Sequence, residues 1–133
     1  CSSKPCVFCP NISIGSHGDP ALGSTFQVNL NNAPVGSTAW LFGKVGTCGA
    51  GIQLSAPFCG TMYGDPGQIL LPPLPASGSF ACDGNAAWNL QIPTNPGLCG
   101  LNLCMQWCFA CPSATSVVGL GLSQALEFSI TGS

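Results

Sequence analysis

The fold is decided by one stretch of the chain, Leu101-Asn-Leu-Cys-Met-Gln-Trp-Cys-Phe109. Its residues alternate with a period of two, which is typical of a β-strand whose successive side chains point to opposite faces. One face should belong to the core and carries Leu101, Leu103, Met105, Trp107 and Phe109. The other face carries Asn102, Cys104, Gln106 and Cys108. We therefore expect a central strand of a sheet.

The same alternation recurs along the chain, for example in Thr25–Asn31, Trp88–Ile92 and Leu126–Thr131. Gly and Pro, 18 and 12 in number, break the sequence into short segments with turn signals between them. Short alternating strands at this spacing favour an antiparallel sandwich or barrel. The sequence predicts an all-β fold, an immunoglobulin-like antiparallel β-sandwich with disulfide cross-links and an N-terminal extension. Strands are expected over 11–14, 24–31, 38–45, 51–55, 60–63, 68–71, 79–81, 86–92, 101–109 and 125–131.

The ten cysteines are the strongest signal in the composition. An even, high count in a short chain predicts a disulfide framework formed in an oxidising compartment. We therefore expect a secreted protein, extracellular or at the cell surface, and interpret the start at Cys1 as a mature terminus left by cleavage. Acylation of Cys1 stays open. Disulfides are expected at Cys1, Cys6, Cys9, Cys48, Cys59, Cys82, Cys99, Cys104, Cys108 and Cys111.

Two cysteines of the 101–109 stretch fall on the face away from the core, so they need a partner outside the sheet. We expect the N-terminal segment to supply it: residues 1–14 would form a cysteine-rich tail or donor-like strand, and residues 15–133 the sandwich. Cys48 with Cys59 and Cys82 with Cys99 would be local bridges. Whether the tail bonds its own domain or a neighbour stays open. Contact between subunits is expected at Cys1, Cys6, Cys9, Cys104, Cys108 and Cys111.

Charged side chains are nearly absent. Two basic and four acidic residues make up 5% of the chain, against about 25% in an ordinary soluble domain. Two cations are too few for nucleic acid or a polybasic membrane contact, and no apolar run reaches the ~20 residues of a membrane-spanning helix. Because monomeric domains normally carry mixed surface charge, we expect partners to cover part of this surface.

Catalytic constellations are weak. The single histidine, His17, lies in the Gly-rich segment 15–20 together with Ser16 and Asp19. Neighbours within one loop rarely adopt the geometry of a catalytic triad, so a plain turn is the better interpretation. The acidic residues are scattered, and Glu127 is expected to be a solvated strand position. We expect no enzyme, no catalytic residue and no cofactor.

Metal binding has only partial motifs. Cys6-x-x-Cys9 and Cys108-x-x-Cys111 have the spacing of zinc ligands, but the cysteine count favours disulfides. Neither motif continues into the histidine that covalent haem requires. The segments 65–67 and 83–85 resemble calcium loops but lack the repeated acidic ligands. No metal site is expected, and turns are the simpler interpretation.

Aromatic residues leave a second possibility. Trp40, Trp88, Trp107 and Tyr63 could form a platform for sugars. Trp88 and Trp107 are in register with core positions, so burial is the better interpretation for both. Trp40 and Tyr63 stay open as carbohydrate contacts. The sequence Asn11-Ile12-Ser13 matches a glycosylation sequon, which would mark a surface segment.

Three blocks of sequence carry a family resemblance. They are Gly23-x-Thr25-Phe26-x-Val28-x-Leu30 with Ala33-Pro34 and Ala39-Trp40-Leu41; Ala87–Pro93 with Pro96–Leu98 and Gly100–Trp107; and Leu122–Gly132. In this order they resemble the small β-sandwich modules found at the ends of secreted proteins from planctomycetes and similar bacteria. The resemblance implies this fold and secretion, and it carries no catalytic residues. The cysteine load departs from it and suggests a covalently reinforced role.

These features predict an extracellular structural subunit that self-assembles into a disulfide-reinforced filament, fibre or surface layer. The expected partner is a second copy, as a homo-oligomer or homopolymer joined through the N-terminal tail, with no nucleic acid and no membrane span. The alternative is a monomeric secreted module that binds carbohydrate or a cell-surface ligand.

Overall fold

The computed structural model describes residues 12–33, 35–54, 60–80, 82–110 and 120–132. The chain is all-β apart from one short 3-10 turn, and its named strands pair antiparallel throughout. The elements are β1 (Ser13–His17), β2 (Thr25–Ala33), β3 (Thr38–Val45), β4 (Ile52–Leu54), β5 (Gly60–Met62), β6 (Ile69–Leu70), β7 (Leu74–Pro75), β8 (Gly84–Gln91), η1 (Pro96–Leu98), β9 (Asn102–Ala110) and β10 (Leu120–Ser129).

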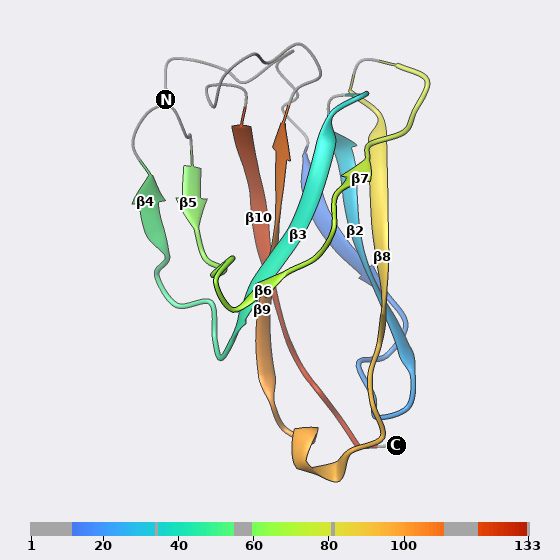
Figure 1. Ribbon diagram of the computed structural model, residues 1–133, viewed down its shortest axis with the longest axis vertical. Coiled ribbons are helices and arrows are strands. Elements are labelled where there is room, and N and C mark those ends of the chain that lie inside the picture. The colour runs from blue at the N-terminus through green and yellow to red at the C-terminus, as the bar shows by residue number, and fades with distance from the viewer. Residues whose placement is uncertain (1–11, 34, 55–59, 81, 111–119, 133) are drawn as a thin grey trace.

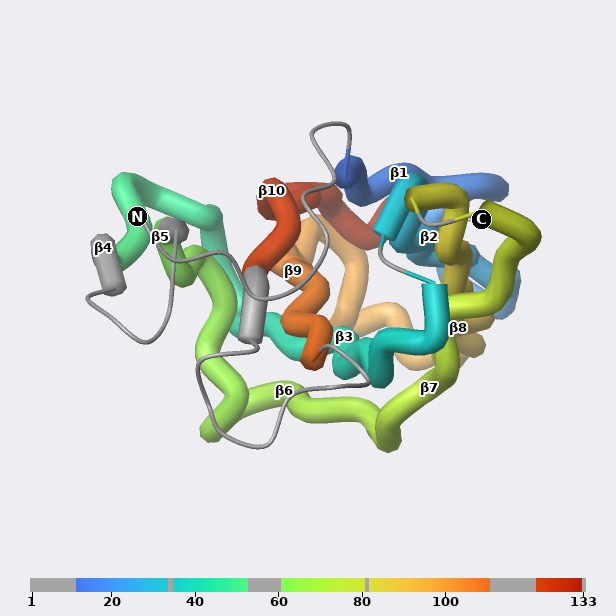
Figure 2. The backbone as a smooth tube through the Cα atoms, turned by 90° about the horizontal axis from the view of Figure 1, so that it is seen from above, coloured from blue at the N-terminus to red at the C-terminus, as the bar shows by residue number. Residues whose placement is uncertain are grey.

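The strands form two main sheets and a separate hairpin. One sheet has the order β1-β2-β8, and the other has the order β10-β9-β3-β6, with β7 also paired to β3. The β4–β5 hairpin stands apart from both. Seen from above, the β10-β9-β3 sheet lies between the β1-β2-β8 sheet and the hairpin (Figure 2). The molecule therefore has three layers, and the hairpin is the outermost on its side.

The core lies between the two main sheets. Alternate residues of β2, namely Phe26, Val28 and Leu30, are buried and face the other sheet. Trp107 contributes the largest fully buried side chain, from β9. The rings of Phe26 and Phe128 lie 4.6 Å apart between centroids and join β2 to β10. Burial of such apolar faces is the main favourable contribution to folding, and here it requires both sheets.

The strand pattern of the sequence is largely confirmed. The strand predicted over 38–45 is β3 as it stands, and β2, β8 and β9 differ from their predictions by two residues or fewer at each end. Met105, Trp107 and Phe109 are buried as predicted, whereas Leu101 and Leu103 are half-buried against the core. The long strands were predictable because alternation over eight or nine residues leaves only one face for the core.

Other strands were predicted wrongly. The first strand begins at Ser13 rather than at residue 11, so the expected boundary of the tail at residue 14 lies inside β1. No strand occupies residues 79–80, where the side chain of Asp83 instead accepts hydrogen bonds from the turn. A short strand at 74–75 went unpredicted because its Pro-rich sequence hides the pairing with β3.

The last strand, β10, starts at Leu120, earlier than the predicted residue 125. A β-bulge interrupts it, and the prediction covered only the part that follows the bulge. The pairing with β9 shifts between Leu122 and Ala125, so Ser123 and Gln124 together oppose one residue of β9. The hydroxyl of Ser123 accepts a hydrogen bond from the backbone N–H of Trp107 and donates one to the carbonyl of Gln124. A bulge reverses the alternation of side chains across it, which explains why period-two analysis found only 125–131.

Candidate functional site

The outward face of β9 is not solvated. Gln106 and Cys104 point away from the core, yet both are fully buried, with 0% of their surface exposed. Residues 46–54 and 60–64, which include β4 and β5, lie over them (Figure 2). A partner outside the sheet was correctly predicted. The segment that the structure places there is this hairpin, whereas the predicted N-terminal tail lies outside the described residues.

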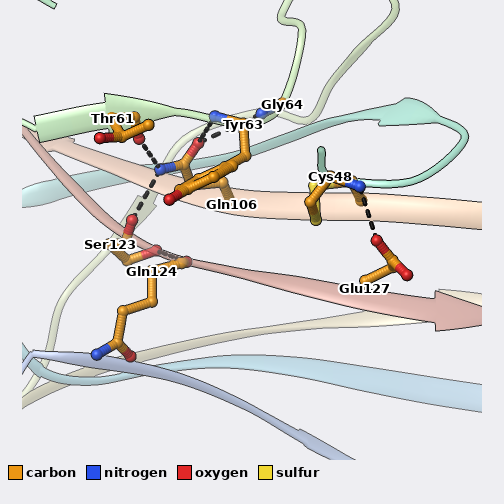
Figure 3. The surroundings of a disulfide bond; sticks show 9 residues. Cys48, Thr61, Tyr63, Gly64, Gln106, Ser123, Gln124 and Glu127 are labelled. Carbon is orange, nitrogen blue, oxygen red and sulfur yellow. Dashed lines mark hydrogen bonds between the residues drawn. A yellow bond between two sulfur atoms is a disulfide. The ribbon is translucent and has the colours of Figure 1, made fainter. Parts of the chain in front are cut away.

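Gln106 holds the hairpin by its side-chain amide. Its Oε1 accepts hydrogen bonds from the backbone N–H groups of Tyr63, at 2.9 Å, and Gly64, at 3.4 Å. Its Nε2 donates to the carbonyls of Thr61, at 2.8 Å, and Ser123, at 2.7 Å. Figure 3 shows this amide between the end of β5 and the bulge of β10. The amide therefore uses both its acceptor and its donor group to connect three segments, which satisfies a buried polar side chain.

A disulfide holds the start of the same segment. Cys48 is bonded to Cys104, with 5.1 Å between their Cα atoms. The backbone N–H of Cys48 also donates to the carboxylate of Glu127, at 2.7 Å (Figure 3). In the sheet register Lys44, Cys104 and Glu127 are neighbours on three adjacent strands. The exposed Glu127 was expected to be only solvated, but it anchors the loop that carries Cys48.

Tyr63 lines two open grooves. One, of about 530 Å³, is lined by Lys44, Cys48, Gly49, Ala50, Gly51, Ile52, Met62, Tyr63, Gly64, Asp65 and Gln68. The other, of about 470 Å³, is lined by Cys48, Tyr63, Gln124, Ala125 and Glu127. Pockets that bind small ligands have volumes of this order. Both grooves are open to solvent, so a ligand here would rest against Tyr63 rather than be enclosed.

The second candidate site is the free edge of β8. Asn85 exchanges two backbone hydrogen bonds with Ser77 on the side away from β2. Alternate residues of a strand direct their backbone groups to the same edge, so Ala87, Asn89 and Gln91 also point theirs outward. Among the described residues no strand pairs with this edge beyond Asn85. In Figure 1 β8 is the long yellow strand, and β7 lies beside its upper part.

The side chains of β8 are uncharged on both faces. On the solvent face Asn89 accepts from the amide of Gln27, and Gln91 accepts from the hydroxyl of Thr25, each at 3.0 Å across to β2. On the core face Trp88 and Leu90 are only half-buried. The strand contains neither a charged residue nor a proline. Charged residues and prolines are features that natural proteins use to block edge-to-edge pairing, and β8 has neither.

The predicted cysteine pairings are wrong where the structure describes them. Cys48 bonds Cys104 and not Cys59, and Cys99 has a free thiol and so is not the partner of Cys82, which is itself disulfide-bonded. Cys104 is used within the chain and is therefore not an inter-subunit contact. The alternation of side chains in β9 gave no information on which loop would lie over its outward face. Cys1, Cys6, Cys9, Cys59 and Cys111 lie outside the described residues.

Cys108 has a free thiol, in contrast to the disulfide expected for it. It lies on the outward face of β9, opposite Trp40 on one side and Leu122 on the other. Burial raises the pKa of its thiol from 9.0 to about 11. Cys108 is half-buried, whereas Cys99 is exposed. Because the thiolate is the reactive form of cysteine, we expect the raised pKa to make Cys108 less reactive at neutral pH than an ordinary thiol.

The remaining candidate residues are dispersed. His17 ends β1 and is exposed, as is Asp19. Asp65 accepts from the N–H of Gly67, and Asp83 from those of Ser79 and Phe80, so both carboxylates stabilise turns. No cluster of potential metal ligands occurs within the described part of the chain. The structure therefore brings together no triad and no calcium loop from these residues.

The predictions for the aromatic residues had different outcomes. Trp107 is buried in the core as predicted, Trp88 is half-buried at the β8 edge, and Trp40 and Tyr63 are also half-buried. Of these, Tyr63 alone lines the grooves described above. The sequence analysis missed Gln106. Its position on the polar face of an otherwise apolar strand, between two cysteines, was the available signal that this face is covered.

Comparison of the chain with protein-family models, with curated proteins and with solved structures finds no match. Over the residues that the structure describes, no helix has the length and apolar character needed to cross a membrane.

Proposed function

We propose that this protein is an extracellular structural subunit that self-assembles. The observation that carries the proposal is the β8 edge, where no described strand pairs with the outward backbone groups of Ala87, Asn89 and Gln91 and no charge or proline opposes pairing. Such an edge is a template for another strand. A sequence that is 5% charged adds little repulsion between copies. Assembly into a filament, fibre or surface layer is the form we propose.

The fold that we propose for this subunit is immunoglobulin-like. In that fold one sheet has the strand order A-B-E-D and the other contains C, F and G. The orders β1-β2-β8 and β10-β9-β3 support this assignment, with β8 as strand E. Within the described residues, the position of strand D beside β8 is then occupied only by the bridge between Ser77 and Asn85. A strand from another chain would complete the sheet at that position.

Secretion is part of the same proposal. The intrachain disulfide between Cys48 and Cys104, together with the disulfide-bonded Cys82, supports folding in an oxidising compartment. A disulfide that holds a surface hairpin also stabilises a protein exposed outside the cell. Covalent links between subunits belong to this proposal, and so do the tail contacts at Cys1, Cys6 and Cys9.

A second candidate function is carbohydrate binding, and the grooves beside Tyr63 favour it. A tyrosine ring with nearby polar side chains, here Lys44, Asp65 and Gln68, offers stacking and hydrogen bonds to a sugar. Titration of Tyr63→Ala and wild-type protein with soluble oligosaccharides, followed by NMR chemical shifts of residues 60–68, tests this candidate. Saturable shifts in the wild type alone would support it, and their absence in the wild type would exclude these sugars.

Self-assembly is tested by sedimentation velocity over a wide concentration range, with and without reductant. We expect association that strengthens with concentration, and bands above the monomer on non-reducing gels where covalent links form. A single monomeric species at every concentration in both conditions would contradict the proposal. Retained association under reductant would assign the contact to non-covalent pairing.

A further inference from the structure

We propose that two copies of this chain pair through β8, antiparallel and about a two-fold axis at Asn89. This inference rests on the proposed self-assembly and assigns one of its contacts, because a two-fold contact joins two copies and a filament or layer needs a further contact. Pairing about that axis places Asn89 opposite Asn89 of the second copy, and Ala87 opposite Gln91. These are the residues whose backbone groups point outward, so each pair would exchange two N–H···O bonds, as in any antiparallel ladder.

Both faces of β8 suit this register. On the solvent face, the side-chain amide of Asn89 would lie beside that of Asn89 in the second copy. The side-chain hydrogen bonds from β2 to Asn89 and Gln91 would then continue across the interface as one row. Asn and Gln ladders of this kind stabilise stacked strands. On the core face, Trp88 would lie opposite Leu90 of the second copy. Both are half-buried at the edge, and an aromatic–aliphatic cross-strand pair is favourable.

The other edge of the same sheet is less available. β1 lies against β10 of the opposite sheet, so its border is already closed by the sandwich. β8 has β7 near its start and no described strand beside Ala87–Gln91 (Figure 1). A second copy is favoured as the occupant because β8 contains no charged residue. Two such strands meet without repulsion.

Charged substitutions of Asn89, the residue on the proposed two-fold axis, test this register. In N89K, lysine would face lysine, and in N89E glutamate would face glutamate. Like charges directly opposite on paired strands are destabilising, so each variant alone should associate roughly fivefold more weakly than wild type, or worse. An equimolar mixture of the two should recover association at least to the wild-type level, because lysine then faces glutamate.

The matched controls are N29K and N29E. Asn29 belongs to the same solvent face but to the middle strand β2, so these variants add the same charges away from the edge. Their association should equal that of wild type, alone and mixed. We expect each variant to fold, because Asn89 is exposed and its replacement loses only the hydrogen bond from Gln27. Thermal unfolding of each variant checks this.

The outcomes separate the two proposals. Weakening in N89K and N89E with recovery in the mixture, while the Asn29 variants are unaffected, supports pairing at Asn89. Wild-type association that the Asn89 variants leave unchanged overturns this contact but leaves self-assembly standing. If removal of residues 1–11 abolishes association and the Asn89 mixture shows no recovery, the N-terminal tail is the occupant and this inference is wrong. A monomeric wild type overturns both.

Discussion

Cys104, in the middle of β9, is bonded to Cys48, which lies 56 residues earlier in the chain. The bond crosses from the sheet to the loop that precedes the β4–β5 hairpin. Together with the amide of Gln106 it holds that hairpin over the outward face of β9 (Figure 3). This covalent bond and this side chain therefore hold the layer outside the sandwich, together with the carboxylate of Glu127 at the Cys48 loop, and the roles of the bond and of Gln106 can be tested.

Removal of the disulfide should cost considerable stability. A cross-link that closes a loop of this length is expected to stabilise by about 4 kcal/mol through the entropy of the unfolded chain. The double variant C48A/C104A should therefore lose about that much free energy of unfolding in urea titrations under non-reducing conditions. Cys108→Ala on the same strand is the matched control because its thiol is free. An unchanged midpoint in the double variant would contradict this assignment.

Replacement of Gln106 by leucine should loosen the hairpin. The variant keeps a similar volume but removes the hydrogen bonds that the amide makes with the N–H of Tyr63 and with the carbonyls of Thr61 and Ser123. Each buried unsatisfied group costs about 1–3 kcal/mol, so we expect a loss of about 2–4 kcal/mol as part of the cost is relieved by water. Hydrogen exchange at Tyr63 and Gly64 should accelerate.

The control for that experiment is Gln27→Leu, which removes a hydrogen bond between exposed side chains. Its effect should stay within about 0.5 kcal/mol. Equal losses in the two variants would show that Gln106 has no special role in holding the hairpin.

The bulge of β10 depends on Ser123. Ser123→Ala removes the acceptor for the buried N–H of Trp107, and we expect a loss of about 1–3 kcal/mol. The exchange protection of the Trp107 amide should fall more than that of its neighbours in β9. Ser129→Ala, on the exposed face of the same strand, serves as the comparison. Undiminished protection at Trp107 would argue that water replaces the hydroxyl.

Stability should fall at alkaline pH because of Cys108. Its thiol has a raised pKa of about 11 in the folded protein and 9.0 as its ordinary value. Between these values the unfolded chain releases a proton that the folded chain retains, so the free energy of unfolding falls as pH rises from 9 to 11. The expected loss is about 2 kcal/mol, present in wild type and absent in Cys108→Ala.

The same property can be measured by thiol labelling. At neutral pH the exposed Cys99 should react with iodoacetamide while Cys108 stays unlabelled until the protein is unfolded. Peptide mass spectrometry distinguishes the two sites. Comparable labelling rates for both cysteines in the folded protein would show that Cys108 is not buried as described.

The sequence by itself determined the strands that form the sandwich. Alternation in β2, β8 and β9 assigned one face of each strand to a core that includes Val28 and Trp107, because side chains in a strand point to opposite faces with a period of two. The near absence of charge and the high cysteine count were equally plain, and they led to the expectation of disulfides and of partners.

Only the tertiary structure decided what covers each face and edge. Alternation shows that Cys104 and Gln106 share the outward face of β9, but it contains no information on which distant segment lies there. The partners Cys48 and Tyr63 come from loops 56 and 43 residues away in sequence. Loop paths are set by the packing of the whole chain and not by local periodicity. For the same reason the open edge of β8 became visible only once the strand order was known.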